Sequence, residues 1–307
     1  MIAWLLTQQI VVLFLMIGLG SLLVVFGLVK ATDSRVLSLI CIYLITPCVI
    51  LKSFQINYTY VVRDGFLLAI IAAIAIHVIL FFVIWLFSLL FHFDVVEKSS
   101  IIYSNSGNLI IPLVVSVLGN QWVIYASAFL CVQLFFIFTH CQSIMKGQTM
   151  LNFRRLFTNI NLLSIIIGLI MFVSGVKMPK VPYEVVSSIA ACIGPVSMIM
   201  LGMIMTSVNW RQVVKYKRLY LVTIMKMIVT PIMILFFLKY SGLSDMVKNG
   251  RMILLISLLA IITPSATIIT QFAQIYHHDE QYAGSINAVT TLISIITMPL
   301  MIWIYLN

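Results

Sequence analysis

The sequence contains very few charged residues. Only 8% of its 307 residues are Asp, Glu, Lys or Arg, whereas 63% are hydrophobic, and soluble domains carry roughly 25% charged residues. A chain of this composition cannot cover a globular surface with groups that water solvates. The composition therefore excludes a water-soluble fold and indicates a membrane domain along the whole chain.

Acidic residues are scarcer than basic ones, and all of them fall in loops or at the ends of apolar segments. They are Asp33, Asp64, Asp94, Glu97, Glu184, Asp245, Asp279 and Glu280. Cation/proton antiporters hold their ion with a carboxylate inside the membrane. The lack of such a carboxylate counts against that class and is consistent with a site for anions.

The sequence also lacks the residue patterns of a membrane enzyme or a metal site. It has no H-E-x-x-H motif, no paired acids within an apolar segment and no nucleophile elbow. Its five cysteines lie in apolar segments without the short paired spacing of metal ligands. The net charge of +10 is spread over short loops instead of forming one patch. We therefore expect no catalysis, no metal, no cofactor and no nucleic-acid partner.

Long apolar runs recur along the chain, and several reach the roughly 20 residues with which a helix crosses about 30 Å of hydrocarbon. The first run has no basic segment before it and no cleavage site after it, so we interpret it as a retained helix and not as a signal peptide. Division at polar clusters predicts ten spans. They are about 10–29, 36–54, 66–91, 99–118, 122–145, 160–176, 184–208, 217–240, 251–274 and 282–305.

The distribution of Lys and Arg predicts the orientation of these spans. With the N-terminus outside, the loops on the cytoplasmic side hold more of these residues than the outer loops, which favours both termini outside. Five spans per half would give the halves opposite orientations. We predict a first five-helix repeat at 1–145, a short basic cytoplasmic linker at 146–159 and a second, inverted repeat at 160–307.

Prolines mark similar places in the two halves. Pro47 and Pro195 are 148 residues apart (195 − 47), and Pro112 and Pro264 are 152 residues apart (264 − 112). Proline removes a backbone donor from a helix, and such interruptions persist at membrane depth only beside protein or water. Matched interruptions in two halves indicate an inverted repeat.

Polar stretches in the fourth and ninth spans predict interrupted helices and a binding site between them. The fourth span reads Tyr-Ser-Asn-Ser-Gly-Asn from position 103, and the ninth reads Thr-Pro-Ser-Ala-Thr from position 263. A half-helix that begins inside the membrane presents about +0.5 charge, which favours carboxylate groups. The asparagines can instead bond neighbouring helices, and both interpretations stay open. The candidate binding residues are Asn105, Ser106, Asn108, Pro112, Thr263, Pro264 and Ser265.

Lys226 and His77 extend the candidate site. Lys226 lies nine residues into the eighth span (226 − 217), roughly 13 Å along a helix. A lysine at that depth needs a partner, which is either a substrate carboxylate or backbone carbonyls, such as those freed near Pro231. His77 holds nearly the equivalent place in the first half. It could couple transport to protons or simply bond a neighbouring helix.

The order of these motifs resembles the auxin efflux carrier family. The stretch from Asn105 to Pro112, with a following Gly119, resembles the first crossover helix of that family. The run Pro-Ser-Ala at 264–266 and the later run Ala-Gln-Ile-Tyr at 273–276 resemble its ninth helix. An acidic loop and a last helix with Pro-Leu follow these runs, and the likeness spans essentially the whole chain.

The resemblance implies an all-α membrane protein of ten transmembrane helices in two inverted five-helix repeats, with crossed broken helices four and nine. It implies Asn105, Pro112 and Pro264 as crossover residues, an elevator-like movement, a homodimer and the carriage of organic acids. The short linker resembles the compact bacterial members, which include malate and malonate permeases. The residues at 106–108 differ from the apolar filler of the plant carriers, which disfavours an auxin-like aromatic substrate.

We therefore predict a permease for small organic anions such as malate or malonate in the cell membrane, surrounded by lipid. Coupling to protons or to sodium is left open. The alternative is a sodium-coupled symporter resembling the bile-acid family, in which Gln271 and two asparagines would coordinate sodium through oxygen. Sodium-dependent uptake would separate the two.

Overall fold

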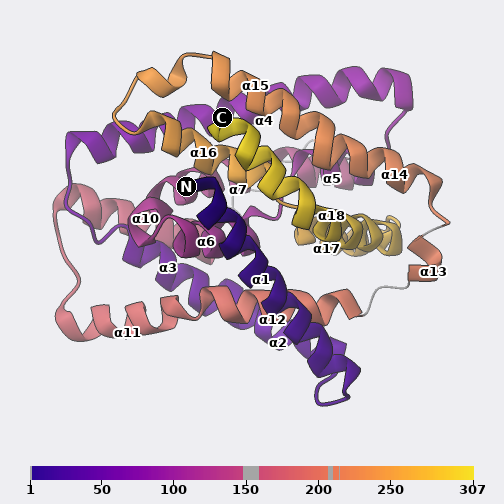
Figure 1. The fold of residues 1–307 in the computed structure, drawn as a ribbon, viewed down its shortest axis with the longest axis horizontal. Helices are drawn as coiled ribbons and strands as arrows, with labels where there is room; N and C mark the ends of the chain where they lie inside the picture. Colours follow the sequence, from indigo (N-terminus) through magenta and orange to yellow (C-terminus); the bar gives the residue numbers. More distant parts are fainter. Residues whose placement is uncertain (1, 148–158, 207–209, 214) are drawn as a thin grey trace.

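The computed structural model describes residues 2–147, 159–206, 210–213 and 215–307. Within these residues the secondary structure is helical, with one isolated β-bridge (Figure 1). In the described ranges, six helices are long and apolar enough to cross a membrane, and shorter apolar helices accompany them. The predicted all-α class is confirmed, and the long apolar helices are consistent with the predicted membrane protein. The six are Ala31–Ser53, Tyr60–Phe91, Asn120–Lys146, Lys180–Thr206, Lys217–Tyr240 and Glu280–Leu306.

The first half of the chain forms α-helices interrupted by short 3-10 and π segments. The α-helices are α1 (Ile2–Val25), α2 (Ser34–Ile40), α3 (Thr46–Ser53), α4 (Tyr60–Phe91), α5 (Val95–Ile102), α6 (Ser106–Val117), α7 (Val123–Phe136) and α8 (Gln142–Lys146). The short segments are η1 (Ala31–Asp33), η2 (Cys41–Ile45), η3 (Asn120–Trp122) and η4 (Ile137–Cys141).

The second half is built similarly. Its α-helices are α10 (Ile160–Ser174), α11 (Lys180–Ala191), α12 (Ile193–Thr206), α13 (Trp210–Val213), α14 (Lys217–Ile224), α15 (Thr230–Tyr240), α16 (Gly250–Ile262), α17 (Thr267–Ile275) and α18 (Glu280–Leu306). The short segments are η5 (Met225–Val229) and η6 (Leu243–Asp245). The predicted linker at 146–159 falls largely outside the described residues.

The start of α4 differs from the prediction. The helix begins at Tyr60, six residues before the predicted 66, because the Thr59 hydroxyl accepts a hydrogen bond from the Val62 N–H and caps it. The charged pair Arg63 and Asp64, which suggested a loop, lies in the first turns with both side chains nearly half exposed. A cap and solvent exposure therefore allow this helix to start among polar residues.

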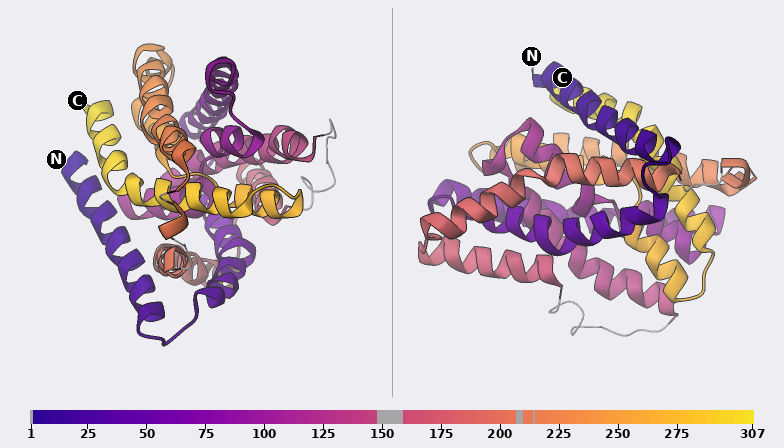
Figure 2. Two further views of the ribbon diagram at one scale, coloured as in Figure 1. Left: turned by 90° about the vertical axis from the view of Figure 1, so that its right-hand side faces the viewer. Right: turned by 90° about the horizontal axis from the view of Figure 1, so that it is seen from below.

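The helices form two packed groups. One contains α1, α2, α3, α10, α11 and α12, and the other contains α4 to α8 together with α14 to α18. In Figure 1, α2, α3, α11 and α12 lie below, whereas α4, α14 and α15 lie above. The groups meet where α1 and α12 contact α6, and α1 lies beside α18, which brings the two chain ends close together (Figure 2).

Two prolines are preceded by widened turns. Pro47 in α3 follows η2, and Pro231 in α15 follows η5, and both short segments are π-helical. A proline ring clashes with the carbonyl four residues earlier and supplies no N–H, and a helix can absorb both effects in a wider turn. Lys226 lies in η5, so its side chain leaves the helix from a widened turn.

Close packing of α1 against α12 depends on glycine. A Cβ added to Gly202 would lie 1.9 Å from the Ile17 carbonyl oxygen, and one added to Gly20 would lie 2.2 Å from the Ile199 carbonyl oxygen. The Ser21 hydroxyl donates to the Gly202 carbonyl at 2.9 Å. Small residues at helix contacts allow membrane helices to approach one another closely.

Gly202→Ala should therefore lower the stability of the purified protein by about 1–3 kcal/mol, the usual cost of overpacking. Gly194→Ala is the matched control in the same helix, because a Cβ there meets nothing within 4 Å. Thermal unfolding in detergent measures both variants. Equal melting temperatures would contradict the close contact.

Candidate functional site

The fourth and ninth predicted spans are both interrupted, and the two interruptions are bonded to each other. The Asn105 N–H donates to the Pro264 carbonyl at 2.8 Å, and the Ala266 N–H donates to the Tyr103 carbonyl at 3.0 Å. An antiparallel bridge joins Ser104 to Ser265. We call residues 103–105 and 263–266 together the crossover. Four half-helices meet there: α5 and α16 end at it, and α6 and α17 begin at it.

Amide side chains from two other helices hold the crossover. Gln133 of α7 donates through Nε2 to the Ser104 carbonyl at 2.8 Å. Asn287 of α18 donates through Nδ2 to the Ser265 carbonyl, and the Ser265 N–H donates to the Thr290 hydroxyl at 3.1 Å. Backbone groups freed from a helix inside a membrane need such partners. The sequence analysis missed Gln133 and Asn287, whose only signal is an isolated amide within an apolar helix.

A pocket of about 130 Å³ lies against the crossover. Polar side chains and aliphatic side chains from both groups of helices line it, and no charged residue of the described chain does. The lining residues are Ile42, Thr46, Ser104, Asn105, Leu130, Gln133, Leu134, Ile137, Asn159, Asn161, Ala266, Thr267, Ile268 and Gln271.

Two helices begin at this pocket. Asn105 is the N-cap of α6, and Ala266 is the N-cap of α17. The first N–H groups of an α-helix have no partner within the helix, and together they present about +0.5 charge. The pocket therefore has a positive wall built from backbone, which favours an anion such as a carboxylate.

Asn105 supplies a buried donor beside those helix ends. An N-cap asparagine usually accepts a hydrogen bond from its own helix, but Asn105 makes no capping bond. The side chain is 3% exposed, and its Nδ2 has no hydrogen-bond partner in the described structure. A buried amide donor without a partner is costly, so an acceptor from a ligand would relieve it.

The candidate residues of the ninth span form the interruption between α16 and α17. The Thr263 hydroxyl donates to the Ala260 carbonyl at 2.7 Å, at the end of α16. Pro264 and Ser265 form the irregular segment, and neither lines the pocket. These residues shape the crossover without facing the pocket.

The other candidates of the fourth span are placed differently from one another. Ser106 is fully buried in the first turn of α6, and its hydroxyl has no partner among the described residues. Pro112 lies inside α6, six residues after its start (112 − 106), whereas Pro264 lies in the break. The two prolines therefore do not occupy matching positions. The side chain of Asn108 falls outside what the structure describes.

Lys226 contacts the crossover but does not line the pocket. Its side chain is fully buried, and its Nζ donates to the Ser104 hydroxyl at 2.6 Å and to the Ile101 carbonyl at 3.2 Å. The carbonyl partner belongs to the end of α5 and not to the turn near Pro231. Two of the three Nζ donors therefore have partners within the protein.

His77 belongs to α4, and its ring packs against several aromatic side chains. It is fully buried, stacks on Phe136 with ring centroids 5.1 Å apart, and its Nδ1 lies 2.7 Å from the Ala73 carbonyl. The Nε2 has no partner in the described chain. Tyr103 connects this cluster to the crossover, with its ring centroid 6.3 Å from that of His77.

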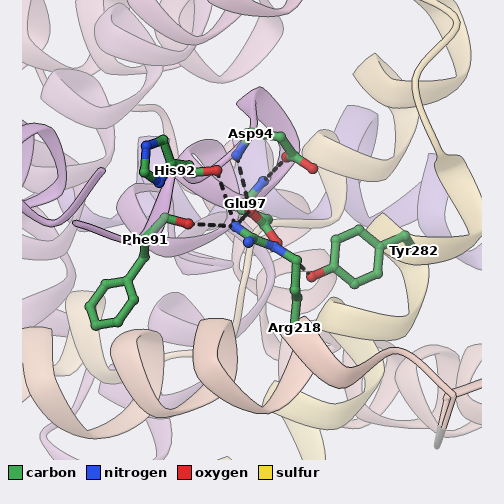
Figure 3. A network of polar contacts seen from close by, with 6 residues as sticks. All are labelled: Phe91, His92, Asp94, Glu97, Arg218 and Tyr282. Atoms are coloured by element: carbon green, nitrogen blue, oxygen red, sulfur yellow. Dashed lines mark hydrogen bonds and ion pairs between the residues drawn. The ribbon is translucent and has the colours of Figure 1, made fainter. Parts of the chain in front are cut away.

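A second polar network joins the beginnings of three helices (Figure 3). The Glu97 carboxylate, with no exposed side-chain area, accepts two hydrogen bonds of 2.7 Å from Arg218 and one of 2.9 Å from Tyr282. Arg218 also donates to the carbonyls of Phe91 and His92 at the end of α4. The network ties α5, α14 and α18 to one another. Sequence analysis placed Glu97 at a helix end and missed its burial.

Arg218→Met should lower the free energy of unfolding by about 2 kcal/mol, because it leaves the buried Glu97 carboxylate without its ion pair while the arginine itself is partly exposed. Lys217→Met, at the exposed neighbouring position, is the control. Thermal unfolding of both variants measures the difference. A melting temperature unchanged in both would show that the network contributes nothing.

Residues 5–302 match the model of a family described as membrane transport protein. No curated protein matches the sequence.

Proposed function

Because the chain belongs to the auxin efflux carrier family of membrane transport proteins, we propose that it is a secondary transporter that binds a small organic anion at the crossover. The observation that carries the proposal is the Nδ2 of Asn105, a buried donor at the start of α6 against the pocket, which has no hydrogen-bond partner among the described residues. A carboxylate oxygen accepts hydrogen bonds from such an amide and from helix N-termini.

The size of the pocket supports a small substrate. Its volume of about 130 Å³ gives room for an acid of a few carbons, such as malate or malonate. Leu130, Leu134 and Ile137 give it an apolar wall opposite amide and hydroxyl groups. The substrate is therefore a small carboxylate whose carbon chain lies against that wall.

Similar bonding in the two halves supports an inverted repeat. Gln133 holds the Ser104 carbonyl as Asn287 holds the Ser265 carbonyl, and Asn105 and Ala266 are both N-caps. We infer a chain that crosses the cell membrane ten times with both termini outside. Its two repeats cover 1–145 and 160–307.

The two groups of helices support an elevator-like movement. The pocket is lined by Thr46 and Asn161 from one group and by Asn105, Gln133 and Thr267 from the other. A shift of the helices that hold the crossover, α4 to α8 and α14 to α18, against the other group would carry the bound anion with them. The shift would change the side of the membrane from which the pocket is reached. This movement is the proposed form of alternating access.

A panel of carboxylates tests the binding site. A ligand at one hundred times its Kd stabilises the folded protein by about 2.7 kcal/mol, so malate or malonate in choline buffer should raise the melting temperature. Asn105→Ala should remove the shift, and Asn120→Ala, an exposed position, should keep it. A shift that requires sodium would favour the sodium-coupled symporter. No shift with any acid would contradict the proposal.

A further inference from the structure

The crossover has a negative side as well as a positive one. The half-helices α5 and α16 end there, and each helix C-terminus carries about −0.5 charge from carbonyl groups without intrahelical partners. Ile101 and Ile261 lie in these two last turns. Two converging C-termini amount to about one negative charge inside the protein.

Lys226 lies against both C-termini. Its Nζ donates to the Ile101 carbonyl at 3.2 Å and to the Ser104 hydroxyl at 2.6 Å, and that hydroxyl donates onward to the Ile261 carbonyl at 3.1 Å. One ammonium group thus reaches the end of α5 directly and the end of α16 through Ser104. Its single positive charge matches the summed charge of the two helix ends.

No carboxylate of the described residues takes part in this arrangement. In the described part of the chain the ion pairs are Arg63 with Asp64 and Arg218 with Glu97. A lysine near the membrane centre costs about 2.5–3.5 kcal/mol on insertion scales, so its retention without an acidic partner needs another reason. Carbonyls at half-helix C-termini and in unwound segments are the groups with which transporters coordinate sodium.

We propose that the Lys226 ammonium is the built-in cation of the crossover. It holds the place that a coupling ion such as sodium would take, neutralises the ends of α5 and α16, and positions Ser104, which lines the pocket. Anion binding then requires no free metal cation. This role rests on the proposed anion transport, because it describes the charge that supports the same site.

The first test needs no carboxylate. Lys226→Ala leaves a cavity beside the two C-termini, and ethylammonium or sodium should bind in it and raise the melting temperature of the purified variant. Wild-type protein and Lys226→Met, whose side chains fill the space, should not respond to either cation. The proposal is overturned if Lys226→Ala responds to neither cation, or if wild type and Lys226→Met respond to the cations as strongly as Lys226→Ala does.

The second test measures flux of the stabilising acid in proteoliposomes. Wild-type flux should be equal in sodium and in choline, whereas Lys226→Ala should lose at least tenfold in choline and recover in part with ethylammonium. Lys239→Met is the control, because Lys239 is exposed and donates to the Ile304 carbonyl, away from the crossover. Sodium-dependent wild-type flux, or full flux of Lys226→Ala in choline, would overturn the proposal. If no acid binds wild type while the first test succeeds, the proposed function fails and the cation role stands.

Discussion

Asn105→Asp is expected to weaken anion binding by roughly a thousandfold. The substitution keeps the shape of the side chain but replaces the unpartnered Nδ2 donor with a second acceptor oxygen that carries charge. Two like charges about 4 Å apart repel by about 4 kcal/mol at an effective dielectric constant of 20. Affinity for the transported acid should therefore fall roughly a thousandfold, and uptake of the labelled acid should fall with it.

Asn120→Asp is the matched control for this substitution. Asn120 is exposed at the start of η3, so the same chemical change there adds surface charge outside the pocket. Its uptake should equal that of wild type. Binding of the acid to Asn105→Asp with wild-type affinity would place the anion elsewhere in the protein.

Gln133→Leu should lower both stability and substrate affinity. The substitution removes the donor of the Ser104 carbonyl, and a buried group without its partner costs about 1–3 kcal/mol. Gln133 also lines the pocket, and its Oε1, which has no partner in the described chain, can accept a hydrogen bond from a substrate hydroxyl such as that of malate. The Kd for the acid should rise at least tenfold, which binding measurements on the purified variant would show.

Asn287→Leu separates the two effects. It removes the corresponding donor of the Ser265 carbonyl, but Asn287 does not line the pocket. Its melting temperature should fall like that of Gln133→Leu, while the affinity of the remaining folded protein stays close to wild type. Equal losses of affinity in both variants would mean that Gln133 acts only through the fold.

The sequence predicted the class of the protein and the two interrupted segments because both are local properties. Apolar runs of membrane length and polar residues within them can be counted directly along the chain. The position of the interruption in the fourth span was harder to predict from the sequence. Pro112 suggested a break there, yet the helix continues through it, and the chain leaves helical geometry at Tyr103 to Asn105.

The partners of the polar residues depend on contacts between distant segments. Glu97 bonds Arg218 and Tyr282, which lie 121 and 185 positions away in the sequence. The spacing of apolar residues along the chain does not predict such a pairing. The direction of Lys226 depends on the widened turn before Pro231, which an ideal helical projection would misplace. Asn105, in contrast, was identified correctly as a residue of the interrupted helix. Only the structure shows that its Nδ2 has no partner among the described residues.

A structure of the protein with its stabilising acid bound would test the central claim most directly. The account predicts one carboxylate group between the starts of α6 and α17, with an oxygen within hydrogen-bond distance of Asn105 Nδ2. Lys226 should remain bonded to Ser104 and Ile101 in that complex. An acid bound away from the crossover, or at the crossover together with a metal cation in the place of the Lys226 ammonium, would contradict the account.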